Sequence, residues 1–279
     1  MLLRGAFLAG MAALVASGAQ ACDAITDGIG LPGRFAEVTF SNTAPRGQHE
    51  NWIAADAQLV MHAGFDVLTS EYGHNIMGPL RDTKELAIHV RQAGDTSRIT
   101  CPKGVVLPEG QVFEDIAPRL VDVDGDGLPE VITVQSDVKL GARLAIYDRR
   151  GKLAAATPNI GRTNRWLAPI GAADLDGDGY IEIAYIDRPH LARLMRVWRY
   201  KNGKLELVAE RDGLTNHRIG EDFISGGVRD CGQGPELITA NADWSRVMAT
   251  TLSDGTLRAR DIGPHTGPSS FQNALACKK

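Results

Sequence analysis

A nine-residue acidic motif occurs twice in this chain, and its spacing limits the possible architecture more than any other feature. The motif Asp122-Val-Asp-Gly-Asp-Gly-Leu-Pro-Glu130 returns as Asp174-Leu-Asp-Gly-Asp-Gly-Tyr-Ile-Glu182, so position 174 repeats position 122 after 52 residues. Self-similarity at a period of roughly 20 to 50 residues is typical of proteins built from repeated supersecondary units. The chain is therefore predicted to contain copies of one such unit.

The segments around the motif repeat as well. A Glu followed by an apolar, β-branched run, which predicts a strand, occurs at 85–90, 130–134, 182–186 and 236–240. The last three runs are each followed by a hairpin pattern with Gly at the turn, at 143–147 with Gly151, 193–198 with Gly203 and 246–250 with Gly255. Segments 117–123, 168–173 and 223–228 supply a preceding strand. Each unit is thus expected to have four strands.

A four-stranded antiparallel sheet cannot cover both of its faces alone, and stacking such sheets around an axis produces a β-propeller. We expect an all-β protein with one β-propeller domain over residues 22–279, clearest over 113–262. The length leaves room for about five blades, of which four are recognisable; the first would run from Arg34 to Glu71, with strands at 35–40 and 58–61. A β-sandwich or an open β array with two decorated hairpins stays open as an alternative.

Residues 1–21 have the pattern of a secretory signal peptide. Arg4 supplies the positive start, residues 6–16 are almost wholly apolar, and Ala19 and Ala21 are small residues before the expected cleavage site. We therefore expect export to the periplasm or the cell exterior. Lipidation of Cys22 is an alternative, although Ala19 stands where a lipobox has Leu.

An exported chain with an even number of cysteines is expected to form disulfides. The four cysteines allow three connectivities, and we predict Cys22–Cys101 and Cys231–Cys277. Four free or metal-binding thiols would be the competing interpretation, but the chain lacks a Cys-x-x-Cys spacing.

The charge of the chain argues against several classes of partner. The formal net charge is -4, and no block of Lys or Arg occurs, which disfavours binding to nucleic acid or to an anionic membrane surface by bulk electrostatics. After the first twenty residues no apolar stretch approaches the roughly 18 residues that a membrane span needs. We expect a monomer that binds a protein or a carbohydrate.

The composition of the two acidic loops points to calcium. Asp at loop positions 1, 3 and 5, the carbonyl of position 7 and the Glu at position 9 together offer the oxygen ligands that Ca²⁺ prefers. The predicted ligands of the two sites are Asp122, Asp124, Asp126, Leu128 and Glu130, and Asp174, Asp176, Asp178, Tyr180 and Glu182. Magnesium fits less well, since it requires a stricter octahedron. Metal-free Asp-Gly turns remain an alternative.

The loops are not EF-hands, because loop position 12 holds Thr133 or Tyr185 in place of Glu and the flanking segments alternate as strands do. They resemble the FG-GAP/VCBS repeats, the type found in integrin α-subunits, over roughly residues 72–262. This resemblance implies a β-propeller with calcium in the two loops. The copy at 229–236 has lost the carboxylate series and contains Cys231, and the copy ending at Glu85 retains only Asp82 and Glu85, so neither is expected to bind calcium well.

Polar loop residues around the strands supply a possible ligand face. They are Trp166, His190, His217, Glu221 and Asp222. No nucleophile elbow, phosphate-binding Gly loop or His-Glu-x-x-His pair occurs. We expect an exported binding or scaffold module with structural calcium, and lean against an enzyme. The alternative is a propeller hydrolase or lyase acting on a polysaccharide or a phosphoester, which would require His190, His217, Glu221 and Asp222 to converge in one pocket.

Overall fold

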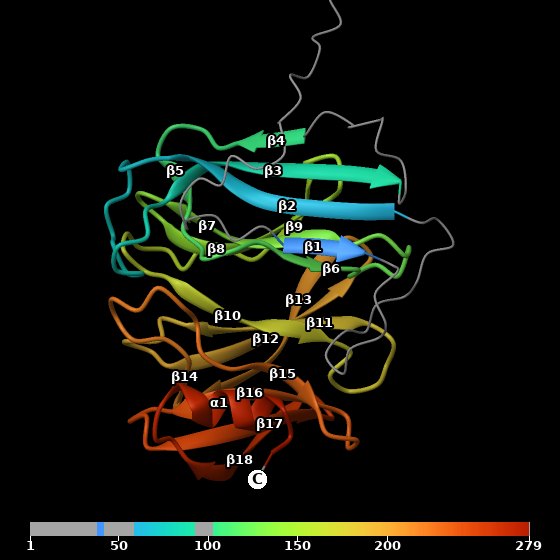
Figure 1. Ribbon diagram of the computed structural model, residues 1–279, viewed down its shortest axis with the longest axis vertical. Coiled ribbons are helices and arrows are strands. Elements are labelled where there is room, and N and C mark those ends of the chain that lie inside the picture. The colour runs from blue at the N-terminus through green and yellow to red at the C-terminus, as the bar shows by residue number, and fades with distance from the viewer. Residues whose placement is uncertain (1–37, 42–58, 93–102, 279) are drawn as a thin grey trace, which may run out of the picture.

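The computed structural model describes residues 38–41, 59–92 and 103–278. The predicted signal peptide, its cleavage site and the predicted Cys22–Cys101 disulfide lie outside these residues. Within them the chain is built from antiparallel strands arranged in three sheets, with one short helix, α1 (Pro268–Leu275), near the end (Figure 1). The all-β fold class is confirmed. None of the described helices is long and apolar enough to cross a membrane.

The first sheet has nine strands. They are β1 (Val38–Ser41), β2 (Leu59–Leu68), β3 (Thr83–Gln92), β4 (Lys103–Val106), β5 (Gln111–Phe113), β6 (Arg119–Val121), β7 (Glu130–Asp137), β8 (Gly141–Tyr147) and β9 (Leu153–Ala156). The strand order is β1-β2-β3-β5-β7-β8-β9, with β4 paired to β3 and β6 paired to β7. The short strand β5 therefore links two groups of four strands, β1 to β4 and β6 to β9.

The second sheet contains β10 (Leu167–Ala173), β11 (Ile181–Asp187), β12 (Leu194–Lys201) and β13 (Lys204–Asp212), in that order. The third contains β14 (Leu214–Thr215), β15 (Gly227–Asp230), β16 (Pro235–Asn241), β17 (Arg246–Ser253) and β18 (Thr256–Pro264). Its order is β14-β16-β17-β18, with β15 also paired to β16. The sheets follow one another along the long axis of the molecule (Figure 1).

The repeated strands and hairpins predicted from the sequence are confirmed. The four Glu-led runs form β3, β7, β11 and β16, and the Gly turns join β8 to β9, β12 to β13 and β17 to β18. Asn202-Gly203 and Asp254-Gly255 have positive φ at both positions, which is the conformation of a type I′ turn. This turn twists in the same sense as the strands that it joins, so the local sequence fixes these hairpins.

Two sequence-based boundaries differ from the structure. The segment 34–71, predicted as a blade of its own, contributes β1 and β2, and β2 pairs with β3 from the Glu85 copy. Both therefore belong to one sheet, and the count of about five blades is not confirmed. In the third sheet, the strand predicted over 223–228 begins only at Gly227, because residues 216–226 form a connection between β14 and β15.

This connection reflects a common feature of the first strand in each unit. Against the continuous strand β16 it is split into β14 and β15, and against β7 it is split into β5 and β6. In the second sheet the equivalent strand, β10, stays whole and takes a bulge between Pro169 and Gly171. The two splits place residues 114–118 and 216–226 outside regular pairing.

The apolar core lies between the sheets. In β11, Ile183 and Tyr185 pack with residues of β7, β8 and β10, whereas Ala184 and Ile186 pack with residues of the third sheet. Successive side chains of a strand point to opposite faces, so this strand is apolar on both sides and buried between two neighbours. A separate cluster, which includes Phe65, joins the β2 and β3 pair to β6, β7 and β8.

Candidate functional site

The first acidic loop, between β6 and β7, brings three carboxylates together. Asp122, Asp124 and Glu130 each offer an oxygen, and these oxygens lie within 4.8 Å of one another. Asp122 accepts hydrogen bonds from the backbone N–H groups of Gly125 (2.8 Å) and Gly127 (2.9 Å), while Glu130 accepts one from Val123 (3.0 Å). Both glycines have positive φ, which lets the backbone curl around Asp122.

The electrostatics of this loop favour an added cation. Burial raises the pKa of Glu130 to about 8, and the charges of Asp124, Asp126 and Asp122 add to that effect. Burial also raises the pKa of Asp122. Among the described residues, the side-chain cation that pairs with this loop is Arg149, 3.5 Å from Asp126, and both side chains are more than one-third exposed. Such a pair neutralises little of the charge.

The second loop, between β10 and β11, has the same backbone and a different charge balance. Asp174, Asp176 and Glu182 also offer oxygens within 4.8 Å of one another. Here Arg199 of β12 enters the loop. Its Nε donates to Glu182 (2.5 Å), its Nη2 donates to Asp176 (2.5 Å), and its Nη1 lies 2.9 Å from Asp178.

Strand register explains the difference between the loops. Arg199 pairs directly with Glu182 across β11 and β12. In the first sheet Tyr147 pairs with Val131, so the residue that follows β8 opposite Glu130 is Asp148, an acid. A guanidinium thus stabilises the second acidic cluster from within, whereas none of the described residues supplies that counter-charge to the first.

The remaining predicted metal ligands lie in the same loops, outside the two clusters of three. Asp126 accepts a hydrogen bond from the Leu128 N–H (2.8 Å), and Asp178 accepts one from the Tyr180 N–H (3.0 Å). These bonds hold the turns in shape. Coordination by the Leu128 and Tyr180 carbonyls stays a prediction.

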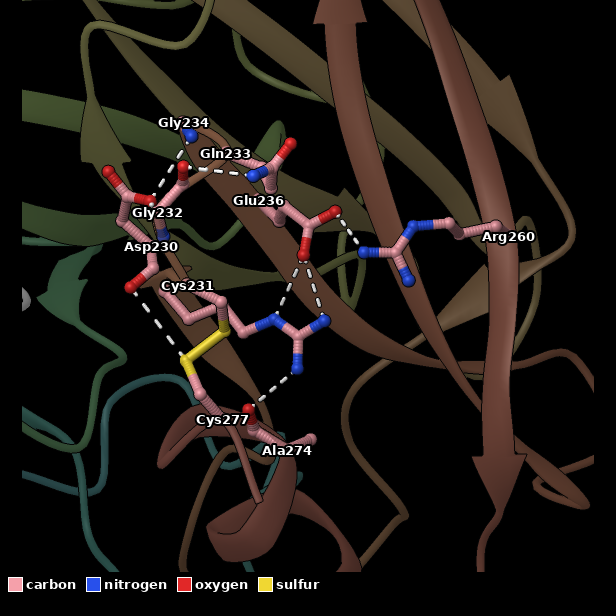
Figure 2. Close-up of a disulfide and its surroundings, with 10 residues drawn as sticks. Asp230, Cys231, Gly232, Gln233, Gly234, Glu236, Arg260, Ala274 and Cys277 are labelled. Atoms are coloured by element: carbon pink, nitrogen blue, oxygen red, sulfur yellow. Dashed lines mark hydrogen bonds and ion pairs between the residues drawn. A yellow bond between two sulfur atoms is a disulfide. The ribbon is translucent and has the colours of Figure 1, made fainter. Parts of the chain in front are cut away.

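The copy between β15 and β16 keeps the turn without the carboxylate series. Asp230 accepts hydrogen bonds from the N–H groups of Gly232 (2.7 Å) and Gly234 (3.1 Å), as Asp122 does in the first loop (Figure 2). Glu236 is paired with two guanidinium groups, those of Arg229 (2.8 Å) and Arg260 (2.5 Å). The two arginines therefore neutralise the carboxylate of this third loop.

The predicted Cys231–Cys277 disulfide is confirmed. Figure 2 shows that it ties this third loop to the residues that follow α1. Arg229 strengthens the link, because its Nη1 donates to the carbonyl oxygen of Ala274 in α1 (2.7 Å). The β15–β16 region is therefore linked to the C-terminal helix segment by a disulfide and by a hydrogen bond.

A cavity of about 280 Å³ is lined by residues that lie outside the acidic loops. It is formed by the segment after β2, the residues before β10, the β11–β12 connection and the β14–β15 connection. The residues that line it include His74, Arg165, Trp166, Arg188, His190 and Ile219. The cavity combines two imidazoles and two guanidinium groups with apolar walls.

One imidazole, His74, is anchored by a buried carboxylate. Its Nδ1 lies 2.6 Å from Glu114, which is fully buried and also accepts a hydrogen bond from the Ser136 hydroxyl (2.5 Å). Burial raises the pKa of Glu114. Burial and the nearby Glu114 charge raise the pKa of Asp82 to about 7. The contact with Glu114 fixes the orientation of the His74 ring.

The second imidazole, His190, is held in one tautomer. The Nε2 of His217 lies 2.9 Å from the Glu221 carbonyl, which can only accept, so this nitrogen carries the proton. The Nδ1 of the neutral His217 ring then accepts from the Nε2 of His190, at 3.0 Å. Burial lowers the pKa of His217 and lowers that of His190 to about 4, so both rings are neutral at pH 7. The proton-free nitrogen of His190 is Nδ1.

The predicted ligand face is brought together in part. His217 lies against the ring of Trp166, with centroids 4.8 Å apart, and next to His190. The carboxylate of Glu221 turns to Arg218, and Asp222 is exposed and does not line the cavity. Sequence reasoning missed His74 and Glu114, which are 40 positions apart and lie in the β2–β3 connection and in the gap between β5 and β6.

Comparisons with known proteins find a repeat family and distant structural similarity. Solved structures similar to this chain include the exotype rhamnogalacturonan lyase YesX (15% identity, TM-score 0.39, covering 77% of this chain and 51% of that one). A Bacillus licheniformis rhamnogalacturonan lyase is also similar (14% identity, TM-score 0.40, covering 81% and 55%). So is a quinohemoprotein alcohol dehydrogenase from Pseudomonas putida HK5 (10% identity, TM-score 0.34, covering 83% and 44%).

The chain spans about half the length of the structures that it matches. Among curated proteins, the search finds no match. Residues 122–185, which begin at the first acidic loop and include the second, match the family model of the FG-GAP-like repeat. The chain therefore contains FG-GAP-like repeat sequence, as the resemblance of its two acidic loops predicts.

Proposed function

We propose that this protein is a calcium-stabilised β-propeller that acts as an exported binding module. The observation that carries the calcium proposal is the first loop, where Asp122, Asp124 and Glu130 converge and, within the described part of the chain, no guanidinium enters the cluster. The FG-GAP-like repeat match and the stacked, two-sided apolar sheets support the propeller. The count of about five blades stays a prediction.

Calcium would act on the folded state. The ion neutralises carboxylates that otherwise repel one another, and it binds the native loop far better than the unfolded chain. It thereby fixes the turn that leads from β6 into the buried strand β7. The second loop, already paired with Arg199, is expected to take calcium more weakly.

The test is a calcium titration of the purified mature chain, residues 22–279, after treatment with a chelator. Calorimetry gives the number of ions bound, and thermal unfolding gives their effect. We expect the melting temperature to rise with calcium in the wild-type protein and in Asp254→Asn, a control in the exposed β17–β18 turn. Asp124→Asn should lose most of that rise. A wild-type protein that binds no calcium would contradict the proposal.

A second candidate function, a hydrolase or lyase acting on a polysaccharide or phosphoester, is favoured by one observation. His74 lines the cavity and is held through Nδ1 by Glu114, which is the arrangement that orients a general base. The supporting acids proposed from the sequence, Glu221 and Asp222, do not take part. The test is release of reducing ends or phosphate from such substrates by the wild-type protein, with loss in His74→Ala.

A further inference from the structure

The cavity gathers polar groups from segments far apart in the chain. His74 follows β2, Arg165 precedes β10 and His190 follows β11, yet all three line one space of about 280 Å³. Typical ligand pockets in proteins enclose about 300 to 1,000 Å³, so this space suits a small molecule of roughly monosaccharide size. The convergence of three polar side chains from three segments is typical of a ligand-binding site.

Arg165 is the cation of the cavity that has no carboxylate partner among the described residues. Its Nη1 donates to the Asn164 carbonyl (2.9 Å), which leaves the other guanidinium donors for a ligand. Arg188, by contrast, donates from Nε and Nη2 to Asp187 at 2.8 and 3.1 Å. A partly buried guanidinium with free donors matches the planar geometry of a carboxylate.

His190 supplies the opposite kind of group. Because the Glu221 carbonyl fixes the proton positions through His217, the Nδ1 of His190 is an acceptor. It suits a donor such as a hydroxyl. His74 has Nε2 left for the same space, since its Nδ1 is taken by Glu114. The cavity thus offers the Arg165 guanidinium for a carboxylate and imidazole nitrogens for hydroxyl groups. Ile76, Leu191 and Ile219 form an apolar wall.

We infer that this cavity binds a small hydroxylated carboxylate, with Arg165 pairing with the carboxylate and His190 and His74 hydrogen bonding to the hydroxyls. This inference rests on the proposed binding-module function and names its ligand class. The charge balance favours a monoanion over a phosphate dianion. Of the two arginines that line the cavity, only Arg165 has no carboxylate partner among the residues that the structure describes, and the acidic Glu114 lies directly behind His74.

The experiment is calorimetric titration of the full mature chain, with calcium present, using D-glucuronate and D-gluconate as probes. D-Glucose is the neutral control and glucose 6-phosphate is the dianionic one. We expect at least one of the two acids to bind about tenfold or more tightly than glucose and than glucose 6-phosphate, as a charge-assisted pair implies. Absence of binding by both acids, equal binding of glucose, or tighter binding of the phosphate would overturn the inference.

Variants locate the site. Arg165→Gln and His190→Phe should each weaken binding of the acid about tenfold or more, whereas Arg162→Gln, an exposed neighbour that does not line the cavity, should bind as the wild type does. Unchanged binding by Arg165→Gln would also overturn the inference. Calcium titration of the same variants separates the two proposals, because loss of acid binding with intact calcium binding concerns the cavity alone.

Discussion

Replacing Glu130 with Gln should weaken the effect of pH on the stability of the calcium-free protein. In the folded chain the pKa of Glu130 is raised from its usual 4.5 to about 8, chiefly by burial and then by three neighbouring aspartates. Below pH 4.5 the folded and unfolded states are both protonated at this group. Between pH 4.5 and about 8 only the unfolded state releases the proton, so stability falls as pH rises through this window.

The size of this effect follows from the pKa difference. At about 1.36 kcal/mol for each pH unit, the interval from 4.5 to about 8 sets an upper bound of about 5 kcal/mol. Asp124 and Asp126 are exposed to water, which screens the smaller part of the shift that their charges supply, so about 2–4 kcal/mol is a better expectation. For a domain of this size that corresponds to a melting temperature change of about 4–16 °C.

The assay is thermal unfolding in chelator across pH 5 to 9, repeated with saturating calcium. Without calcium, Glu130→Gln should be more stable than the wild type at pH 8 and should lose part of the pH slope. With calcium the order should reverse, because the ion requires an ionised carboxylate that Gln cannot provide. Parallel pH profiles for the two proteins in chelator would refute the reasoning, whatever calcium does.

Two further predictions concern the second acidic loop and the disulfide of the third loop. Arg199→Gln removes the guanidinium from three carboxylates of the second loop, so it should lower the melting temperature in chelator and strengthen calcium binding there, measured by calorimetry, whereas Arg149→Gln should change little. An unchanged second-site affinity in Arg199→Gln would count against Arg199 as the internal counter-ion. Replacing Cys231 and Cys277 together with Ser should cost about 4 kcal/mol on the chain-entropy relation for a 46-residue separation, measured by denaturant unfolding.

The sequence predicts the parts of this fold that are encoded locally. Asn202-Gly203 and Asp254-Gly255 specify hairpins through their own backbone preferences, and the β-branched runs after Glu130 and Glu182 specify buried strands. The acidic clusters are equally local, because all their members lie within nine residues. Such features need no knowledge of what packs around them.

The remainder depends on contacts between distant segments. The pairing of β2 with β3, which merges two predicted blades, has no motif to mark it. Arg199 reaches Glu182 only because the register of β11 and β12 places them opposite each other. The bond from His74 to Glu114 spans 40 positions. Periodicity within a strand specifies its buried face, and it does not specify which partner lies across from it.

The split first strands have a consequence for how the cavity can vary. Glu114 lies in the gap between β5 and β6, while His217 and Ile219 lie in the gap between β14 and β15. Behind each gap the partner strand, β7 or β16, continues without interruption. Residues could therefore be inserted or deleted in either gap without shifting a single pair of the ladder. Related chains could reshape this recess by changing loop length alone while they keep the same sheets.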